Sequence, residues 1–355
     1  MSLPREHFCE RGRLGGGHDR AGMTLARTGP LRDPPRSRRY SRGGDPSPLL
    51  RSASRAFTVG VLLAAAGGSL AACGYRYSAD HYLVYPDRPP AGVVSWSDDD
   101  VVDHLLIHLE GVQPGGAAPF PTIIVFAEGG KRAHDMQGVT WDLAAHGYGG
   151  VAADYQRCDD EGCRRSLFAW RSPADATAVV DVVRRYAVVD PHRIGLLGFS
   201  QGGVYSLLIA AYAPDRVAAI VSYYPVTDFP HWLDKHDAGC WQRFAFHFVR
   251  WYFRRESGAQ SDAEFEQTLT AASPYFVAEK IEAPVLLIHG ERDTTAPVQE
   301  SQRMADRLAA LGKPVELLVI PGAVHIFNFR QPQEAAIARE ATLRWFDRYL
   351  RANAR

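Results

Sequence analysis

Apolar runs alternate with helical patterns from about residue 93 to about residue 350. Several runs are nearly continuous in Val, Ile and Leu, which is typical of parallel strands that are covered on both faces. Between them, apolar residues recur three or four positions apart, which indicates helices. This alternation over about 250 residues predicts an α/β fold on a doubly wound, mostly parallel sheet. The predicted strands are residues 101–109, 122–127, 149–154, 193–199, 217–223, 284–290 and 315–320.

Residues 229–272 break this alternation because they contain no strand-like run. Ligands of open α/β sheets bind beyond the carboxyl ends of the strands. We therefore expect a short helical insertion here, the cap segment, which covers that edge of the sheet. Its aromatic residues either line the substrate site or form only the core of the insertion. Those that recur at helical spacing are Trp241, Phe244, Phe248 and Trp251.

The first part of the chain differs in composition from the rest. Residues 1–55 hold twelve Arg, no Lys and five acidic residues, with many Gly, Pro and Ser and only two aromatic residues. Such a segment cannot bury a core, so we expect a disordered, Arg-rich leader. The remaining residues carry 28 basic and 35 acidic side chains, and this mildly acidic balance argues against a nucleic-acid-binding protein. After residue 73 only residues 194–214 form a charge-free run of 18 residues or more, and a single such run argues against a multispan membrane protein.

Residues 56–73 have the pattern of a secretory signal. Arg51 and Arg55 precede an apolar stretch that is short for a spanning helix, and small residues follow it. The last four residues, Leu70-Ala71-Ala72-Cys73, resemble the lipobox of bacterial lipoproteins. That resemblance implies that Cys73 is acylated and that residues 74–355 form an extracytoplasmic domain, lipid-anchored to a bacterial membrane or secreted. The alternative is a buried apolar helix with an incidental cysteine.

Three cysteines fall in the predicted domain. Cys158 and Cys163 flank a short polar loop in which their sulfur atoms could meet, and an oxidising compartment would favour a disulfide there. Bridges from Cys240 to either of them remain open. We expect no metal site, because no second Cys/His pair lies at zinc spacing.

A glycine-rich turn, residues 198–203, separates the predicted strand 193–197 from an apolar helical pattern at 204–211. Gly-x-Ser-x-Gly between a strand and a helix is the pattern of a nucleophile elbow. The serine adopts a strained backbone, and side chains two positions before and after it would collide with neighbouring backbone. The hydroxyl then lies at a helix N-terminus, whose N–H groups can stabilise an oxyanion. The pattern predicts Ser200 as a nucleophile, the alternative being a purely structural turn.

A serine nucleophile needs a base and an acid that orients the base. In such folds the order along the chain is serine, acid, histidine, each after a later strand. Asp293 follows the strand 284–290 and His325 follows the strand 315–320, so both are candidates. Glu291 is a rival for the acid. We interpret His289, inside an apolar run, as a buried core histidine.

These motifs resemble the α/β-hydrolases, in the branch shared by prolyl-oligopeptidase-type peptidases and dienelactone hydrolases. The resemblance covers about residues 120–350 and implies a serine hydrolase with Ser200, Asp293 and His325 as its triad and with no cofactor. It rests on Asp190-Pro191 leading into residues 198–203, on Ser273-Pro274, on His289-Gly290 before Asp293, and on Gly322 before His325.

The resemblance also implies an oxyanion hole. The N–H group of Gln201 would be one donor, and the second would be that of Gly129 or Gly130 in the loop after the strand 122–127. Glu128 stands where many relatives have histidine. A carboxylate there would repel an oxyanion unless it were protonated or paired, for which Lys131 and Arg132 are near in sequence.

We therefore expect a serine hydrolase that cleaves a small-molecule carboxylic ester through an acyl-enzyme. Ester is favoured over peptide because the propeller of prolyl oligopeptidases needs hundreds of residues, and residues 74–120 are too few for it. The membrane would be reached through the lipid anchor only. The alternatives are a peptidase or amidase with the same mechanism and a non-catalytic binding protein.

Overall fold

The structure of the protein, a computed structural model, describes residues 84–159, 162–164, 173–234 and 240–351. The predicted leader, the signal segment and Cys73 lie outside these residues. Among the helices in the described ranges, none combines the length and apolarity that crossing a bilayer would need.

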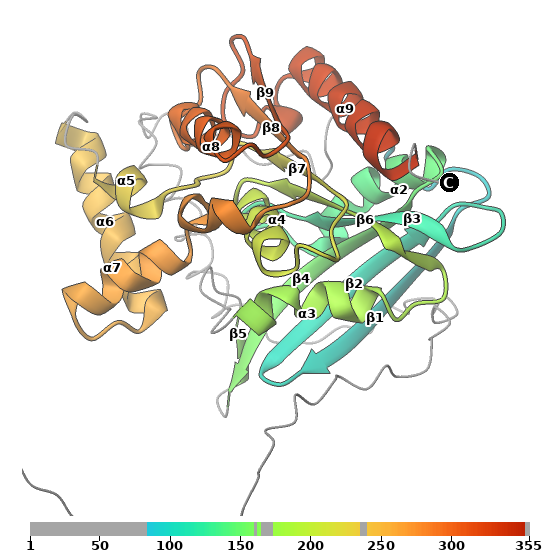
Figure 1. Cartoon of the computed structure of the whole chain (residues 1–355), viewed down its shortest axis with the longest axis horizontal. Coiled ribbons are helices and arrows are strands. Elements are labelled where there is room, and N and C mark those ends of the chain that lie inside the picture. The colour runs from blue at the N-terminus through green and yellow to red at the C-terminus, as the bar shows by residue number, and fades with distance from the viewer. Residues whose placement is uncertain (1–83, 160–161, 165–172, 235–239, 352–355) are drawn as a thin grey trace, which may run out of the picture. The chain divides into compact units, whose positions relative to one another are not determined.

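The centre of the fold is a nine-stranded sheet (Figure 1). Its strands are β1 (Val94–Val102), β2 (Leu105–Gln113), β3 (Phe120–Phe126), β4 (Gly149–Asp159), β5 (Gly162–Arg164), β6 (Val189–Phe199), β7 (Ala219–Tyr223), β8 (Val285–Gly290) and β9 (Val315–Ile320). The strand order is β1-β2-β4-β3-β6-β7-β8-β9, with β5 paired to β4. From β4 through β3 to β9 neighbouring strands are parallel, whereas β1 and β2 add an antiparallel edge. The predicted α/β fold with a mostly parallel sheet is confirmed.

One predicted strand is wrong. The apolar run at 101–109 is two strands, because β1 ends at Val102 and β2 begins at Leu105. Asp103 has a φ of 53°, and Val102 and Leu105 face each other in the antiparallel pair. A two-residue hairpin needs left-handed backbone, which Asp tolerates better than most residues. The apolar residues on both sides of the turn concealed it.

Helices cover both faces of the sheet (Figure 1). Alternate residues of β3 show the division, since Ile124 belongs to one buried cluster and Val125 to the other. The first cluster is closed by α3 (Pro173–Val183), α4 (Gln201–Tyr212) and α8 (Gln299–Ala310). The second is closed by α2 (Gln137–Ala145) and α9 (Pro332–Phe346). Outside the cap segment, the shorter helical elements in the described ranges are η2 (Ala133–Met136), η3 (Pro274–Lys280), η4 (Phe327–Phe329) and η5 (Asp347–Arg351).

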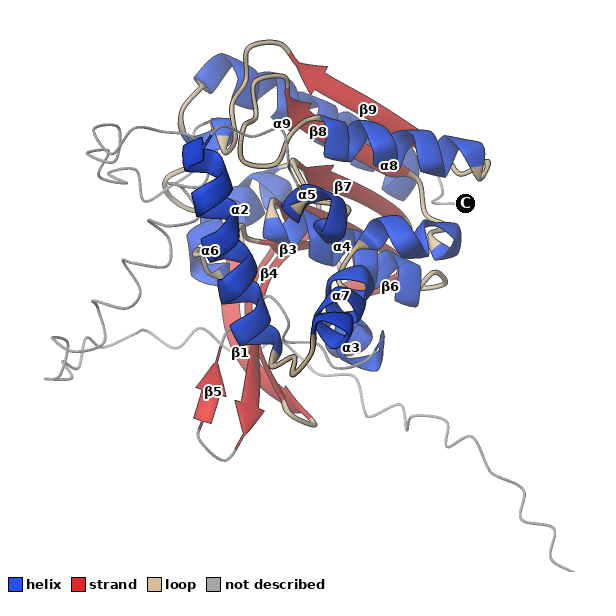
Figure 2. Ribbon diagram, turned by 90° about the vertical axis from the view of Figure 1, so that its left-hand side faces the viewer, coloured by secondary structure: helices blue, strands red, loops and turns tan. Residues whose placement is uncertain are grey.

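The cap segment is helical, as predicted. It consists of α5 (Phe229–Leu233), α6 (Cys240–Ser257) and α7 (Asp262–Ala271), which lie together on one side of the sheet (Figures 1 and 2). The buried rings of Trp232, Phe253 and Phe265 pack with α4 in a third apolar cluster, whereas Trp251 is 53% exposed. These three rings form the core of the insertion. The side chains of Trp241, Phe244 and Phe248 lie outside the described part.

The two ends of the cap segment are tied to each other. Ser273, just after α7, accepts a hydrogen bond from the backbone N–H of Phe229 at 2.9 Å. The same hydroxyl donates to the carbonyl of Leu269 at 2.7 Å. The entry and the exit of the insertion therefore leave the sheet side by side.

The entry of the cap segment is also bound to α8. The buried carboxylate of Glu300 accepts the N–H groups of Thr227 and Asp228, each at 3.0 Å. It further contacts His231 Nδ1 at 2.9 Å. Buried carboxylates of this kind are retained when several donors satisfy them. The cap segment is thus fixed at the carboxyl edge of the sheet.

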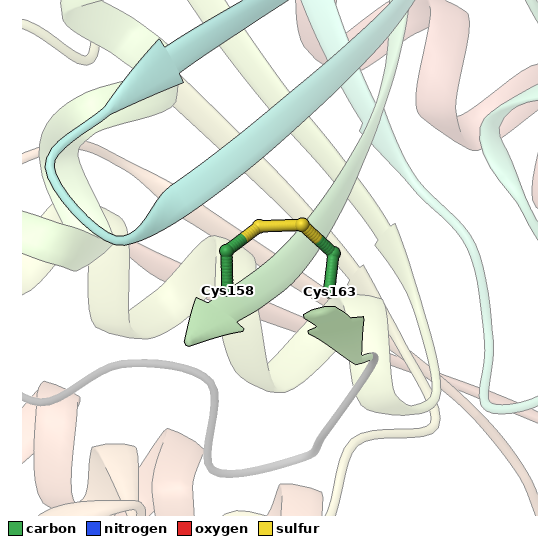
Figure 3. The surroundings of a disulfide bond; sticks show 2 residues. All are labelled: Cys158 and Cys163. Atoms are coloured by element: carbon green, nitrogen blue, oxygen red, sulfur yellow. A yellow bond between two sulfur atoms is a disulfide. The ribbon is translucent and has the colours of Figure 1, made fainter. Parts of the chain in front are cut away.

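A disulfide joins Cys158 to Cys163 (Figure 3). The two residues face each other across the β4–β5 pair. Of the predicted pairings, the structure contains the local one. The side chain of Cys240 lies outside the described residues.

Candidate active site

Ser200 occupies the sharp turn between β6 and α4. Its backbone has φ 50° and ψ −110°, an unfavourable conformation for a residue with a Cβ atom. A Cβ atom on Gly198 would lie 2.0 Å from the carbonyl oxygen of Gly202, and one on Gly202 would lie 2.2 Å from that of Phe126. Both glycines are therefore required sterically, and the turn has the predicted geometry of a nucleophile elbow.

The structure brings together the three residues predicted for the triad. Ser200 Oγ lies 3.1 Å from His325 Nε2, and His325 Nδ1 lies 2.6 Å from Asp293 Oδ2. They come from turns after β6, β8 and β9, where the carboxyl ends of parallel strands meet. The distances fit a serine hydroxyl that donates to the imidazole and an imidazole that donates to the carboxylate. Such a chain can remove the serine proton during attack on a carbonyl.

Glu291, the rival acid, is not part of this chain of hydrogen bonds. It is exposed, and its carboxylate accepts the backbone N–H of Gly322 at 2.9 Å. This bond links the turn after β8 to the turn after β9. The contact fits a residue that supports the loop of His325.

Asp293 is built to remain ionised. One carboxylate oxygen accepts the N–H groups of Thr295 and Ala296, each at 2.9 Å, while the other faces His325. Burial by itself raises the pKa of this carboxyl. The charge of His325 and the hydrogen bonds from His289 and His325 outweigh that effect and hold the pKa of Asp293 at about 2. At neutral pH it can therefore stabilise an imidazolium.

Two residues near the triad were not predicted to be there. His289 is fully buried, as expected of a core residue, but its Nε2 lies 3.4 Å from Asp293 Oδ2. Tyr224 follows β7 and packs its ring against the imidazole of His325. Burial and then the charge of Glu128 raise the pKa of Tyr224 well above its usual value. The sequence signals for His289 are its position four residues before the acid and its place in the His289-Gly290 motif of the family resemblance.

The loop after β3 lies beside the elbow. A Cβ atom on Gly129 would be 3.2 Å from Gln201 Oε1, so this loop approaches the residue that follows Ser200. The Gln201 side chain donates to the Tyr205 hydroxyl at 2.6 Å. Gly129 and Gly130 are exposed, and Gly130 has a φ of 90° that favours glycine. Glu128 is buried beside them.

Across the described ranges, no group of three or more His, Cys, Asp or Glu residues is arranged to hold a metal ion.

A serine at a strained strand–helix turn, with a histidine and an acid from later turns of a mostly parallel sheet, defines a serine hydrolase of the α/β-hydrolase fold. Residues 169–353 match the sequence profile of the prolyl oligopeptidase family, and the chain belongs to that family. The resemblance to the prolyl-oligopeptidase branch of the α/β-hydrolases is thereby confirmed.

Two curated relatives differ in how much of their length the chain covers. The chain is 26% identical over 178 residues to dipeptidyl-peptidase 5 of Porphyromonas endodontalis, a match that covers 50% of this chain and 24% of the peptidase. It is 26% identical over 253 residues to a protein of Methylorubrum extorquens that carries the name carboxymethylenebutenolidase, and this match covers 66% of this chain and 75% of that protein. The chain thus spans about a quarter of the length of the peptidase.

Two solved structures share the fold. The acylaminoacyl peptidase of Pyrococcus horikoshii superposes with a TM-score of 0.58 and 20% identity, over 74% of this chain and 42% of that chain. Acetyl xylan esterase 1 of Thermoanaerobacterium superposes with a TM-score of 0.55 and 20% identity, over 74% of this chain and 87% of the esterase.

Proposed function

We propose that the protein hydrolyses a small-molecule carboxylic ester by a Ser–His–Asp acyl-enzyme mechanism. Ser200 attacks the acyl carbonyl while His325 takes its proton, and Asp293 stabilises the imidazolium that results. His325 then gives the proton to the departing alcohol, and it activates the water that hydrolyses the acyl-enzyme. The observation that carries this proposal is the continuous hydrogen-bonded chain from Ser200 Oγ through His325 to Asp293.

We assign the oxyanion hole to the N–H group of Gln201 and to that of Gly129 or Gly130. The proximity of Gly129 to Gln201 supports this assignment, because both donors must face the same oxygen. Glu128, buried next to Gly129, would oppose the developing charge unless it is protonated or paired. Glu128→Gln should therefore preserve or raise ester turnover.

Ester cleavage is favoured by the extent of the similarities. The two ester-associated relatives, named as a carboxymethylenebutenolidase and an acetyl xylan esterase, are matched over 75% and 87% of their lengths. The two named peptidases are matched over 24% and 42%. Membership of the prolyl oligopeptidase family favours the second candidate, a serine peptidase or amidase with the same triad.

Matched substrates separate the two candidates. The purified protein would be given one acyl group as a p-nitrophenyl ester and as a p-nitroanilide, in acetyl, butyryl, alanyl and prolyl series, with Ser200→Ala as the control. An esterase hydrolyses the esters and leaves the anilides at the level of Ser200→Ala. Turnover of an aminoacyl anilide with a kcat/KM close to that of its ester would favour the peptidase.

We also propose that Cys73 is acylated and that the mature protein is anchored outside the cytoplasm. The lipobox pattern at residues 70–73 supports this, as does the Cys158–Cys163 disulfide, a bond typical of oxidising compartments. A multiply acylated cysteine should hold the protein on a membrane, and Cys73→Ser should release it. Intact mass spectrometry of the membrane fraction tests this, and a mature protein that retains residues upstream of Cys73 would contradict it.

A further inference from the structure

His289 lies on β8, four residues before Asp293, and its side chain is completely buried. A buried imidazole keeps both nitrogens hydrogen-bonded. Its Nε2 lies 2.6 Å from the carbonyl oxygen of Ala296, and its Nδ1 lies 2.7 Å from Ser301 Oγ. Because a carbonyl oxygen only accepts, Nε2 carries the hydrogen, and Nδ1 accepts from the Ser301 hydroxyl. The two partners therefore fix one tautomer.

That N–H group also lies beside the acid of the site. Nε2 of His289 is 3.4 Å from Asp293 Oδ2, the oxygen that accepts from His325 Nδ1. The same carboxylate oxygen thus lies between two imidazoles. His325 is the partner that moves a proton in the proposed mechanism, whereas His289 has no exposure and no path to a substrate.

Ala296 connects the two ends of this arrangement. Its N–H donates to Asp293 Oδ1 at 2.9 Å, and its carbonyl accepts from His289 at 2.6 Å. The N–H of Ala296 holds one carboxylate oxygen, and the carbonyl of the same residue is held by the His289 side chain, which lies against the other carboxylate oxygen. Ser301, in the first turn of α8, anchors this brace to a buried part of the fold.

We infer that His289 is a positioning residue for Asp293. Its Nε2–H, oriented by Ser301, holds the Ala296 carbonyl and lies against the Asp293 carboxylate. These contacts keep Asp293 Oδ2 aimed at His325. The inference rests on the proposed function, because it assigns His289 a role in the same triad. The reason is geometric. The imidazolium that forms during acylation is stabilised only while the carboxylate faces it. A displacement of a catalytic group by about 1 Å lowers the rate of the reaction strongly.

Two substitutions of His289 distinguish positioning from simple core packing. His289→Leu fills a similar volume and removes both nitrogens, and we expect it to lower kcat for a p-nitrophenyl ester by tenfold or more with KM changed less than about threefold. His289→Gln can present an N–H near the place of Nε2 and should restore at least a third of the wild-type kcat. A donor to the buried Ala296 carbonyl also contributes to stability, so kcat is measured well below the thermal midpoint of each variant, where a purely structural role would leave it unchanged.

Thr342→Val is the matched control. It removes another buried hydrogen bond, the 2.6 Å contact between Thr342 and the Tyr223 hydroxyl, which does not involve Asp293. We expect it to lower the thermal midpoint and to leave kcat within about twofold of wild type. A kcat loss in Thr342→Val as large as that in His289→Leu would overturn the inference, because both would then report general destabilisation.

Ser301→Ala keeps the test decisive if His289→Leu does not fold. Loss of the hydroxyl leaves Nδ1 without the partner that orients the imidazole, and kcat should fall several-fold. A wild-type kcat in His289→Leu overturns the inference. If His289→Leu does not fold, a wild-type kcat in Ser301→Ala overturns it instead. In both cases an inactive Ser200→Ala leaves the proposed function standing. An active Ser200→Ala rejects the proposed function itself.

Discussion

The ring of Tyr224 packs edge-on against the imidazole of His325, with the ring centroids 4.8 Å apart. Tyr224 follows β7 with a φ of 38°, and its hydroxyl donates to Asn328 Oδ1 at 3.2 Å. Ile326, next to His325, also has left-handed backbone, with a φ of 54°. Strained residues of this kind persist where the surrounding structure holds them. The histidine turn is therefore held by a ring from one side and by Asp293 from another.

Replacing the Tyr224 ring should reduce turnover more than removing its hydroxyl. We expect Tyr224→Leu to lower kcat for ester hydrolysis by about tenfold, because His325 loses the surface that limits its rotation. Tyr224→Phe keeps the ring and should stay within about threefold, with a stability loss of about 1 kcal/mol for the hydrogen bond. Steady-state kinetics and thermal denaturation check both, and a Tyr224→Leu variant as active as wild type would contradict the role of the ring.

A methyl group at Gly198 should damage both fold and activity. Because a Cβ atom there would lie 2.0 Å from the Gly202 carbonyl oxygen, the elbow backbone must move. We expect Gly198→Ala to lose about 3 kcal/mol of unfolding free energy and nearly all ester turnover. Gly129→Ala is the contrast, since its Cβ meets only the Gln201 side chain at 3.2 Å. Equal stability of the two variants in urea denaturation would show that the elbow is less constrained than the contacts indicate.

Asp293 should make stability depend on pH at the acidic end. Its pKa of about 2 in the folded protein is below the value of about 3.9 for an unfolded chain. The unfolded state therefore binds the proton first as pH falls. The stabilisation is complete above about pH 5 and is lost progressively between about pH 5 and pH 1, and it amounts to about 3 kcal/mol at neutral pH. Urea denaturation at several pH values should give a steeper dependence for wild type than for Asp293→Asn, and equal slopes would argue against the depressed pKa.

The cap segment should depend on Glu300. Glu300→Gln replaces a buried carboxylate that accepts from Thr227 and Asp228, so it weakens the attachment of the insertion. We expect a loss of about 2 kcal/mol in unfolding free energy. Glu282→Gln removes an exposed ion pair with Lys313 and should cost less than about 1 kcal/mol. Differential scanning calorimetry compares the two, and an unchanged midpoint in Glu300→Gln would contradict the anchoring role.

Local patterns explain what could be predicted from this sequence. The parallel strands follow from nearly continuous apolar runs, and the elbow follows from glycines at fixed distances from Ser200. The order of Asp293 and His325 after their strands placed both in one site. The family resemblance favoured Asp293, but its position in the turn after β8 alone did not separate it from Glu291, because only the fold orients one of the two toward His325.

Other contacts depend on how distant elements meet. His289 reaches Asp293 because the turn after β8 folds back over its own strand, which an apolar run cannot reveal. Tyr224 meets His325 only through the packing of β7 beside the loop after β9. The aromatic residues of the cap segment gave the correct helices, but their spacing was equally consistent with a substrate wall. Trp232, Phe253 and Phe265 pack on α4, whereas the side chains of Trp241, Phe244 and Phe248 lie outside the described residues, so the alternative of a substrate wall stays a prediction for them.

The central claim is that Ser200 is the nucleophile of an acyl-enzyme hydrolase, and active-site labelling tests it most directly. The wild-type protein would be treated with a small fluorophosphonate, digested and mapped by mass spectrometry, with ester hydrolysis followed in parallel. We predict one phosphonyl adduct, on Ser200, and loss of ester turnover in step with labelling. Ser200→Ala should take up no label and show a kcat lower by about 10⁴-fold or more. An adduct on another residue, or a Ser200→Ala variant that keeps a tenth of the wild-type activity, would contradict the account.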